Sequence, residues 1–152
     1  MVLVVVQGKD SDEEVVSMAC SLATRRRASL RGLFVLEVPW TVSLGAWDEE
    51  EERRGRSSLE AARAVAARYG CGLQGKVLPT RHAGQAILEE AAEWCADTIV
   101  MASPHPSREG DAVSYVLQKA TCSVLVWQGK TGPGPCEDRQ RGRTRRARTP
   151  ES

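Results

Sequence analysis

The chain has 152 residues, of which 41% are hydrophobic, and its formal net charge is +1. This length favours one domain with a single core, and so small a net charge does not by itself indicate a charged partner. The apolar run Val2–Val6 is too short for a signal peptide, and nothing approaches the roughly 18 apolar residues of a membrane helix, so we expect no membrane association.

Charge is distributed unevenly along the chain. Residues 1–127 contain 14 Lys or Arg against 17 Asp or Glu, a net of −3, whereas residues 128–152 contain 7 against 3, a net of +4. The second segment is rich in Gly, Pro, Arg and Thr and has no hydrophobic periodicity, so it cannot bury enough apolar surface to offset the entropy of ordering. We therefore predict a folded domain over 1–127 and a disordered basic tail over 128–152.

The cysteines favour a reducing compartment. The chain has five of them, Cys20, Cys71, Cys95, Cys122 and Cys136. Their number is odd and no pair has the C-x-x-C spacing, which disfavours both a disulfide framework and a metal site. Cys20, Cys95 and Cys122 lie in apolar runs, where free cysteine is often a small buried side chain. We expect a cytoplasmic protein with free thiols.

The first strand and helix are predicted from a switch in periodicity. The run of Val and Leu over Val2–Val6 is typical of a strand buried on both faces of a parallel sheet. Ser11 and Glu14 then form the capping-box pattern S-x-x-E, which predicts that the Ser11 side chain binds free N–H groups at a helix start.

The second strand is expected over Leu33–Val38, with Pro39 ending it. A loop of roughly 18 residues should follow, which is long for a compact domain and therefore suggests a functional segment. It contains Trp40, Trp47 and the acidic run Asp48–Glu52.

The second helix is expected to begin near Ser57 and to end at Gly70, because glycine tolerates the left-handed conformation found after helices. The third strand is predicted over Leu73–Leu78, ended by Pro79. The third helix should cover about Ala83–Cys95.

The last elements are a fourth strand over Thr98–Ala102, a fourth helix capped by Asp111, and a fifth strand over Cys122–Trp127. The inward residues of the fourth helix are predicted to be Val113, Val116, Leu117 and Ala120. Strands and helices thus alternate throughout, which predicts an α/β fold: a five-stranded parallel sheet with helices on both faces and right-handed crossovers.

Four segments resemble the universal stress protein family (UspA-like domains). Ala86–Glu89 together with Ala96–Ser103 resembles the family's "AIL…ADLIVMGS", and Tyr115–Val126 resembles "YVLRHAPCPVLVV". Val2–Gly8 and Leu33–Pro39 are similar to its first two strands. The resemblance covers residues 1–127 and implies an adenine-nucleotide alpha-hydrolase-like sheet in the order 3-2-1-4-5. It also implies frequent homodimers, here through the last strand, Cys122–Trp127.

Many family members bind ATP where strands 1 and 4 diverge, through the motif G-x2-G-x9-G-(S/T). In this chain the first glycine aligns with Ala102 and the second with His105, and only four residues then precede Gly110. The hydroxyl position is Asp111, whose carboxylate would repel phosphates. The family's Asp after the first strand is replaced by Gln7.

The sequence therefore predicts no cofactor bound in the usual mode, with ATP or AMP kept as the alternative. The residues that match nucleotide-contacting positions of the family are Gln7, Gly8, Leu36, Met101, Ser103, Gly110 and Asp111. Asp111 suits a helix N-cap better than a ligand role. With His82 and His105 as the only histidines and no second ligand at helical spacing, no metal site is predicted.

Three functions remain open at this stage. The leading hypothesis is a dimeric, non-enzymatic regulatory or stress-response module, since no catalytic residue set is found. The second is an adenine-nucleotide sensor with an altered loop. The third is a scaffold whose segment Trp40–Arg56 binds a protein partner through Trp47. Nucleic-acid binding is not expected, because the basic tail has no aromatic residues for base stacking.

Overall fold

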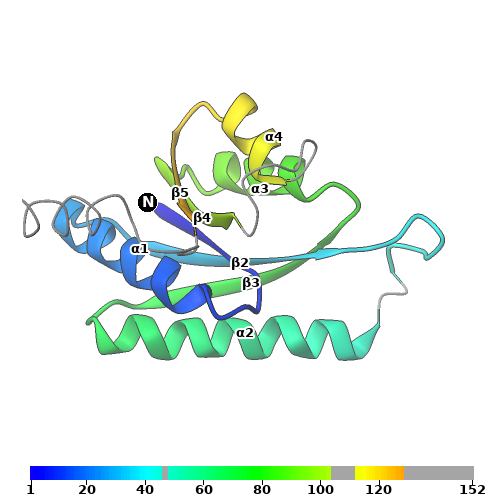
Figure 1. The fold of residues 1–152 in the computed structure, drawn as a ribbon, viewed down its shortest axis with the longest axis horizontal. Coiled ribbons are helices and arrows are strands. Elements are labelled where there is room, and N and C mark those ends of the chain that lie inside the picture. Colours follow the sequence, from blue (N-terminus) through cyan, green and yellow to red (C-terminus); the bar gives the residue numbers. More distant parts are fainter. Residues whose placement is uncertain (46–47, 104–111, 129–152) are drawn as a thin grey trace, which may run out of the picture.

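The computed structural model describes residues 1–45, 48–103 and 112–128. Over these residues strands and helices alternate along the chain (Figure 1). The strands are β1 (Val2–Val6), β2 (Leu30–Glu37), β3 (Leu73–Thr80), β4 (Thr98–Ser103) and β5 (Ser123–Gln128). The helices are α1 (Asp12–Arg26), α2 (Glu49–Arg68), α3 (Ala83–Glu93) and α4 (Ala112–Lys119).

The five strands form one parallel sheet in the order β3-β2-β1-β4-β5, which confirms the predicted fold class and strand order. β1 pairs with β2 along its whole length, from Val2 to Val6. Its pairing with β4 ends at Val4. The two central strands therefore separate at their carboxyl ends, which is where α/β sheets of this kind bind ligands.

Helices cover both faces of the sheet, with α1 and α2 on one side and α3 and α4 on the other (Figure 1). Side chains of β1 alternate between the two layers: Val2, Val4 and Val6 join the cluster under α1 and α2, while Leu3 and Val5 join the cluster under α3 and α4. All five are buried, so this central strand contributes apolar burial to both layers, about 1.5–3 kcal/mol for each large side chain.

The predicted start of the second helix was wrong. α2 begins at Glu49, eight residues before Ser57, and the acidic run forms its first turn. Asp48 is the N-cap and accepts a hydrogen bond from the Glu50 N–H at 3.0 Å. Carboxylates are stabilised at a helix N-terminus by the helix dipole. This charge-based start has no apolar periodicity, which is why the hydrophobic pattern missed it and predicted a longer loop.

Several smaller predictions also fail. Ser11 makes no side-chain capping bond, and Leu117 is 55% exposed although it was placed inward. Cys95 is exposed, whereas Cys20 is buried as expected. Pro79 lies inside β3, because an edge strand tolerates a residue without an N–H donor. Residues 129–152 of the predicted basic tail lie outside the described residues.

Within the described part of the chain, none of the helices is both long enough and apolar enough to cross a membrane.

Candidate functional site

The separation of β1 and β4 opens a cleft of about 390 Å³ at the carboxyl edge of the sheet. It lies on the α3/α4 side and is closed by the first residues of those two helices. The lining residues are Val5, Val6, Gln7, Lys9, Val35, Glu37, Ala83, Ile87, Met101, Ala112 and Val113. Its volume is in the range of small-molecule sites.

The chemistry of this switch-point cleft is mixed. Its walls are mostly apolar, and Val35 and Met101 are among the side chains that line it. Among the residues that the structure describes, two ionisable side chains line it, the cation Lys9 and the carboxylate Glu37. A flat, largely apolar ring with a few polar substituents would fit such walls, whereas a highly charged ligand would meet one cation and one opposing anion.

Gln7 connects the two diverging strands. Its Nε2 donates a hydrogen bond of 3.1 Å to the carbonyl oxygen of Ala102, at the end of β4. The side chain that replaces the family's Asp is therefore engaged in holding the β1 and β4 ends together. Ala102, the residue expected from the resemblance to match the first glycine of the family motif, is itself buried.

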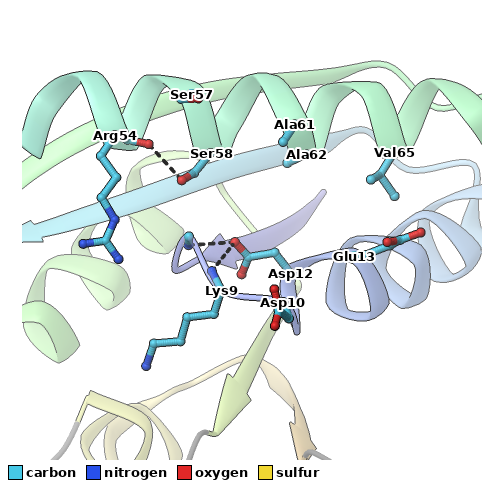
Figure 2. A pocket seen from close by; sticks show the side chains of 11 residues that line it. Lys9, Asp10, Asp12, Glu13, Arg54, Ser57, Ser58, Ala61, Ala62 and Val65 are labelled. Carbon is cyan, nitrogen blue, oxygen red and sulfur yellow. Dashed lines mark hydrogen bonds between the residues drawn. The ribbon is translucent and has the colours of Figure 1, made fainter.

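The backbone N–H groups after β1 are also engaged. One carboxylate, that of Asp12, accepts hydrogen bonds from the N–H groups of Gln7 at 3.0 Å, Gly8 at 2.7 Å and Lys9 at 3.2 Å. Figure 2 shows Asp12 turned toward this β1–α1 turn. Gly8 adopts φ +72°, a left-handed conformation that favours glycine. Successive N–H groups that converge in this way form an anion site, and here the chain's own carboxylate fills it.

A second cleft, of about 550 Å³, lies on the opposite face between the β1–α1 turn and α2 (Figure 2). Three acids and two bases line it, Asp10, Asp12, Glu13, Lys9 and Arg54. Arg54 is also 3.9 Å from a carboxylate oxygen of Glu51 on its own helix. The charges largely balance, so this groove has no clear preference for a charged ligand.

The predicted site residues are only partly brought together. Gln7 and Met101 line the switch-point cleft, and Gly8 lies in the adjoining turn and borders the second cleft. Leu36 is buried in the cluster under α1 and α2, so it faces away from the switch-point cleft. Ser103 is buried at the end of β4.

Gly110 and Asp111, the remaining two candidates, lie outside the described residues. Lys9, Val35 and Glu37 are among the cleft residues that the sequence reasoning missed. Strand alternation was the available signal for two of them, because the neighbours of a buried Leu36 must face the other side of the sheet.

Metal binding has no support from the residues that the structure describes, since no three His, Cys, Asp or Glu side chains among them gather at one point.

Comparisons with known proteins agree with this architecture. The structure is similar to a universal stress protein from Archaeoglobus fulgidus, with 20% identity and a TM-score of 0.69, covering 82% of this chain and 96% of that one. A structure from the same organism in complex with dAMP gives 21% identity, a TM-score of 0.69 and coverages of 82% and 94%. A family protein from Arabidopsis thaliana with AMP bound gives 17% identity, a TM-score of 0.61 and coverages of 86% and 92%. At such identities these likenesses show a shared fold.

A comparison with curated protein sequences gave no match. The sequence model of the universal stress protein family, by contrast, matches residues 1–128, which is the whole α/β domain. The chain therefore belongs to the universal stress protein family.

Proposed function

We propose that this chain is a non-enzymatic regulatory module of the universal stress protein family, acting in the cytoplasm, that does not hold ATP through a glycine loop. The observation that carries the proposal is the Asp12 carboxylate, which occupies the N–H groups of Gln7, Gly8 and Lys9 beside the switch-point cleft. A phosphate needs free donors of this kind, and a carboxylate in their midst repels it.

The sequence of the neighbouring segment supports the same conclusion. Ala102, His105 and Asp111 stand at three of the four positions where the ATP motif has glycine or a hydroxyl. Lys9 is the single cation that lines the switch-point cleft among the described residues. One lysine offers a point charge to phosphates without the cradle of N–H groups that P-loop-like sites supply.

Thermal unfolding with and without ligand tests this proposal. A ligand that binds only the folded state raises the melting temperature, and above its Kd the stabilisation grows with the logarithm of the ligand concentration. With millimolar Mg·ATP we expect no shift relative to Mg²⁺ with chloride alone. A rise in melting temperature that grows with ATP concentration would contradict the proposal.

A second candidate function, sensing of an adenine nucleotide with few phosphates, is favoured by the cleft itself. Its apolar walls and the pair Lys9 and Glu37 suit a ring with one charged group. Fold relatives with dAMP or AMP bound supply the precedent. In this reading Gln7, Gly8 and the Gly110 N–H contact the ligand.

This candidate is tested by titrating AMP and adenosine into three variants, the first two of which are a matched pair. Lys9→Ala should weaken AMP binding about tenfold, the loss of one charge-assisted contact, and leave adenosine unchanged. Lys119→Ala removes an equivalent cation at the far end of α4 and should change neither. Gly110→Val should abolish binding while the fold stays intact, and an unchanged affinity in that variant would exclude this mode.

The proposal includes a homodimer formed through β5. This strand is at the edge of the sheet and is only half buried, and Leu125 on it is 42% exposed. An edge strand with exposed apolar side chains is a template for pairing with a second strand.

A protein partner for the segment after β2 remains a separate hypothesis. α2 includes its second half, so the non-helical part is shorter than expected. Trp40 is 74% exposed, and the Arg81 guanidinium stacks 4.7 Å from its ring centre. Trp47 lies outside the described residues. Deleting 43–52 without losing a captured partner would count against this hypothesis.

A further inference from the structure

Two cysteines that are distant in sequence lie close together where the α2–β3 turn contacts α1. Cys20 lies on α1 and is fully buried, and Cys71 lies in the turn between α2 and β3. The Cys71 Sγ is 3.7 Å from the backbone carbonyl oxygen of Cys20 and 3.4 Å from the Thr24 Oγ1, one helical turn further along α1. Neither thiol has a role in the switch-point cleft, which is at the opposite edge of the sheet.

Only one of these thiols can be reached from outside. Cys71 is partly exposed and lines a cleft of about 760 Å³ at the amino ends of β2 and β3. Thr24, Arg27 and Arg63 line the same cleft. Cys20 does not line it. A small reagent that enters this cleft therefore meets Cys71 first.

The turn that carries Cys71 is able to adjust. Glycines flank the cysteine on both sides, and Gly70 adopts φ +74°. A side chain added at Gly70 or Gly72 would meet no atom within 4 Å, so the surrounding space is open. Backbone freedom at the two glycines allows the Cys71 Sγ to approach the Cys20 Sγ and form a sulfur–sulfur bond.

We propose that Cys71 is an oxidation site and that Cys20 is its resolving thiol, so that hydroperoxides convert the pair into an intramolecular disulfide between α1 and the α2–β3 turn. This goes beyond the proposed function and does not depend on it. Transient disulfides of this kind are the form in which redox sensing occurs in reducing compartments.

The chemistry balances with hydrogen peroxide as the oxidant. The Cys71 thiolate attacks one peroxide oxygen, the O–O bond breaks, and the departing hydroxide takes up a proton to become water. Cys71 is then a sulfenic acid. The Cys20 sulfur attacks the Cys71 sulfur, the S–O bond breaks, and a second water leaves with the Cys20 proton. In total, two thiols lose two hydrogens and peroxide is reduced to two waters.

The surroundings of Cys20 fix the order of these steps. Burial, with smaller contributions from the hydrogen bond and charge of Cys71, raises the pKa of the Cys20 thiol to about 12. A protonated, inaccessible thiol does not react with peroxide. Once Cys71 has become a neutral sulfenic acid, its charge no longer opposes ionisation of Cys20, and the second step becomes accessible.

Peptide mapping of the full chain after peroxide treatment tests the inference. Tryptic cleavage places Cys20 in the peptide 10–25 and Cys71 in 69–76, with no other cysteine in either. We expect the monomer to yield these two peptides joined, two hydrogen atoms lighter than their sum, and separated again by dithiothreitol. Cys71 found as sulfenic or sulfinic acid without the link, or Cys71 joined to a second chain, would overturn the inference.

Three variants test the separate roles assigned to Cys20 and Cys71. Cys20→Ala removes the resolving thiol, so Cys71 should persist as a sulfenic acid that dimedone traps. Cys71→Ser should leave Cys20 unmodified by peroxide, and oxidation of Cys20 in that variant would contradict the assigned order. Cys95→Ser removes an exposed cysteine outside the pair and should leave the 20–71 link intact. In unvaried protein, the oxidised form should also melt at a higher temperature than the reduced form.

Discussion

At the scale of single residues, Asp12 determines which backbone donors are occupied at the turn beside the switch-point cleft. Its carboxylate accepts hydrogen bonds from the N–H groups of Gln7, Gly8 and Lys9, and so it replaces an external anion at the turn after β1. The same carboxylate begins α1, where a negative charge is favoured by the helix dipole. The hydrogen bonds of Asp12 thus stabilise the fold, and in the proposed function the same carboxylate opposes phosphate binding.

Replacing Asp12 by Ala should lower the free energy of unfolding by about 1–2 kcal/mol, because three N–H groups lose a charged acceptor in a turn that water can partly reach. Urea denaturation measures this loss. Asp10→Ala is the matched control: it is an exposed carboxylate of the same turn that makes none of these bonds, and its effect should stay within about 0.5 kcal/mol. Equal effects of the two variants would refute the assigned role of Asp12.

Asp97 is a second residue whose charge matters. Partial desolvation alone would raise its pKa, but the hydrogen bond to Thr98, the Met1 amino group at 3.5 Å and the Arg26 guanidinium at 3.8 Å together lower the pKa below the ordinary 3.8. These contacts join the end of α1 to the start of β4. Since Asp97 is 54% exposed, solvent screens much of the interaction.

The pH dependence follows from the direction of that shift. A carboxyl with a lowered pKa in the folded state stabilises the fold above about pH 3.8, and the contribution is lost as the pH falls through the lower folded-state value. Unfolding by urea at pH 6 and at pH 3 should therefore show wild type and Asp97→Asn converging at the lower pH. A stability difference that stays constant between the two pH values would contradict this role.

At the scale of elements, α2 shows how close packing limits the sequence. Gly55 lies where the helix crosses β2 and β3, and a Cβ at this position would be 2.8 Å from Phe34 Cδ1 and 3.1 Å from Val77 Cγ2. The absence of a side chain lets the helix approach the sheet, even though glycine is a poor helix former.

Gly55→Ala should therefore destabilise the protein by about 1 kcal/mol, since an overpacking cost of about 1–3 kcal/mol outweighs a helix-propensity gain of about 1 kcal/mol. Ser57→Ala, at an exposed position of the same helix, should be neutral or slightly stabilising. Chemical denaturation of both variants gives the comparison. A more stable Gly55→Ala protein would show that the helix is free to move outward.

One part of α2 could be predicted from the sequence and another part could not. Apolar periodicity located the core of α2 and the buried strand β1, because burial dictates those patterns. It missed the charged first turns of α2, where Asp48 and the dipole stabilise the helix and an Arg56–Glu52 pair of 2.6 Å joins successive turns. Charges of this kind look the same in a solvated loop and in a helix.

At the scale of the whole molecule, the alternation of elements was enough for the fold class, and the resemblance supplied the strand order. The site was less accessible to prediction. Gln7 and Met101 do line the cleft, but the bond from Gln7 to Ala102 spans 95 residues and leaves no local pattern. Leu36 faces the other layer because a shift of one residue along a strand reverses the side.

The assembly predicted at this scale is a homodimer through β5. Leu125→Lys places a charge on the exposed edge and should shift the protein from dimer to monomer in analytical ultracentrifugation. Leu117→Lys is the control, because Leu117 is similarly exposed but lies on α4. Wild-type protein that sediments as a monomer at every concentration would exclude this dimer.

The measurement that tests the central claim most directly is isothermal titration of the full chain with Mg·ATP, followed by AMP under the same conditions. Asp12 at the β1–α1 turn and the single cation Lys9 lining the described cleft predict no one-site heat with ATP, and no tighter binding of ATP than of AMP. Saturating one-site binding of ATP at micromolar concentration, tighter than that of AMP, would show that the chain does hold the phosphates and would contradict this account.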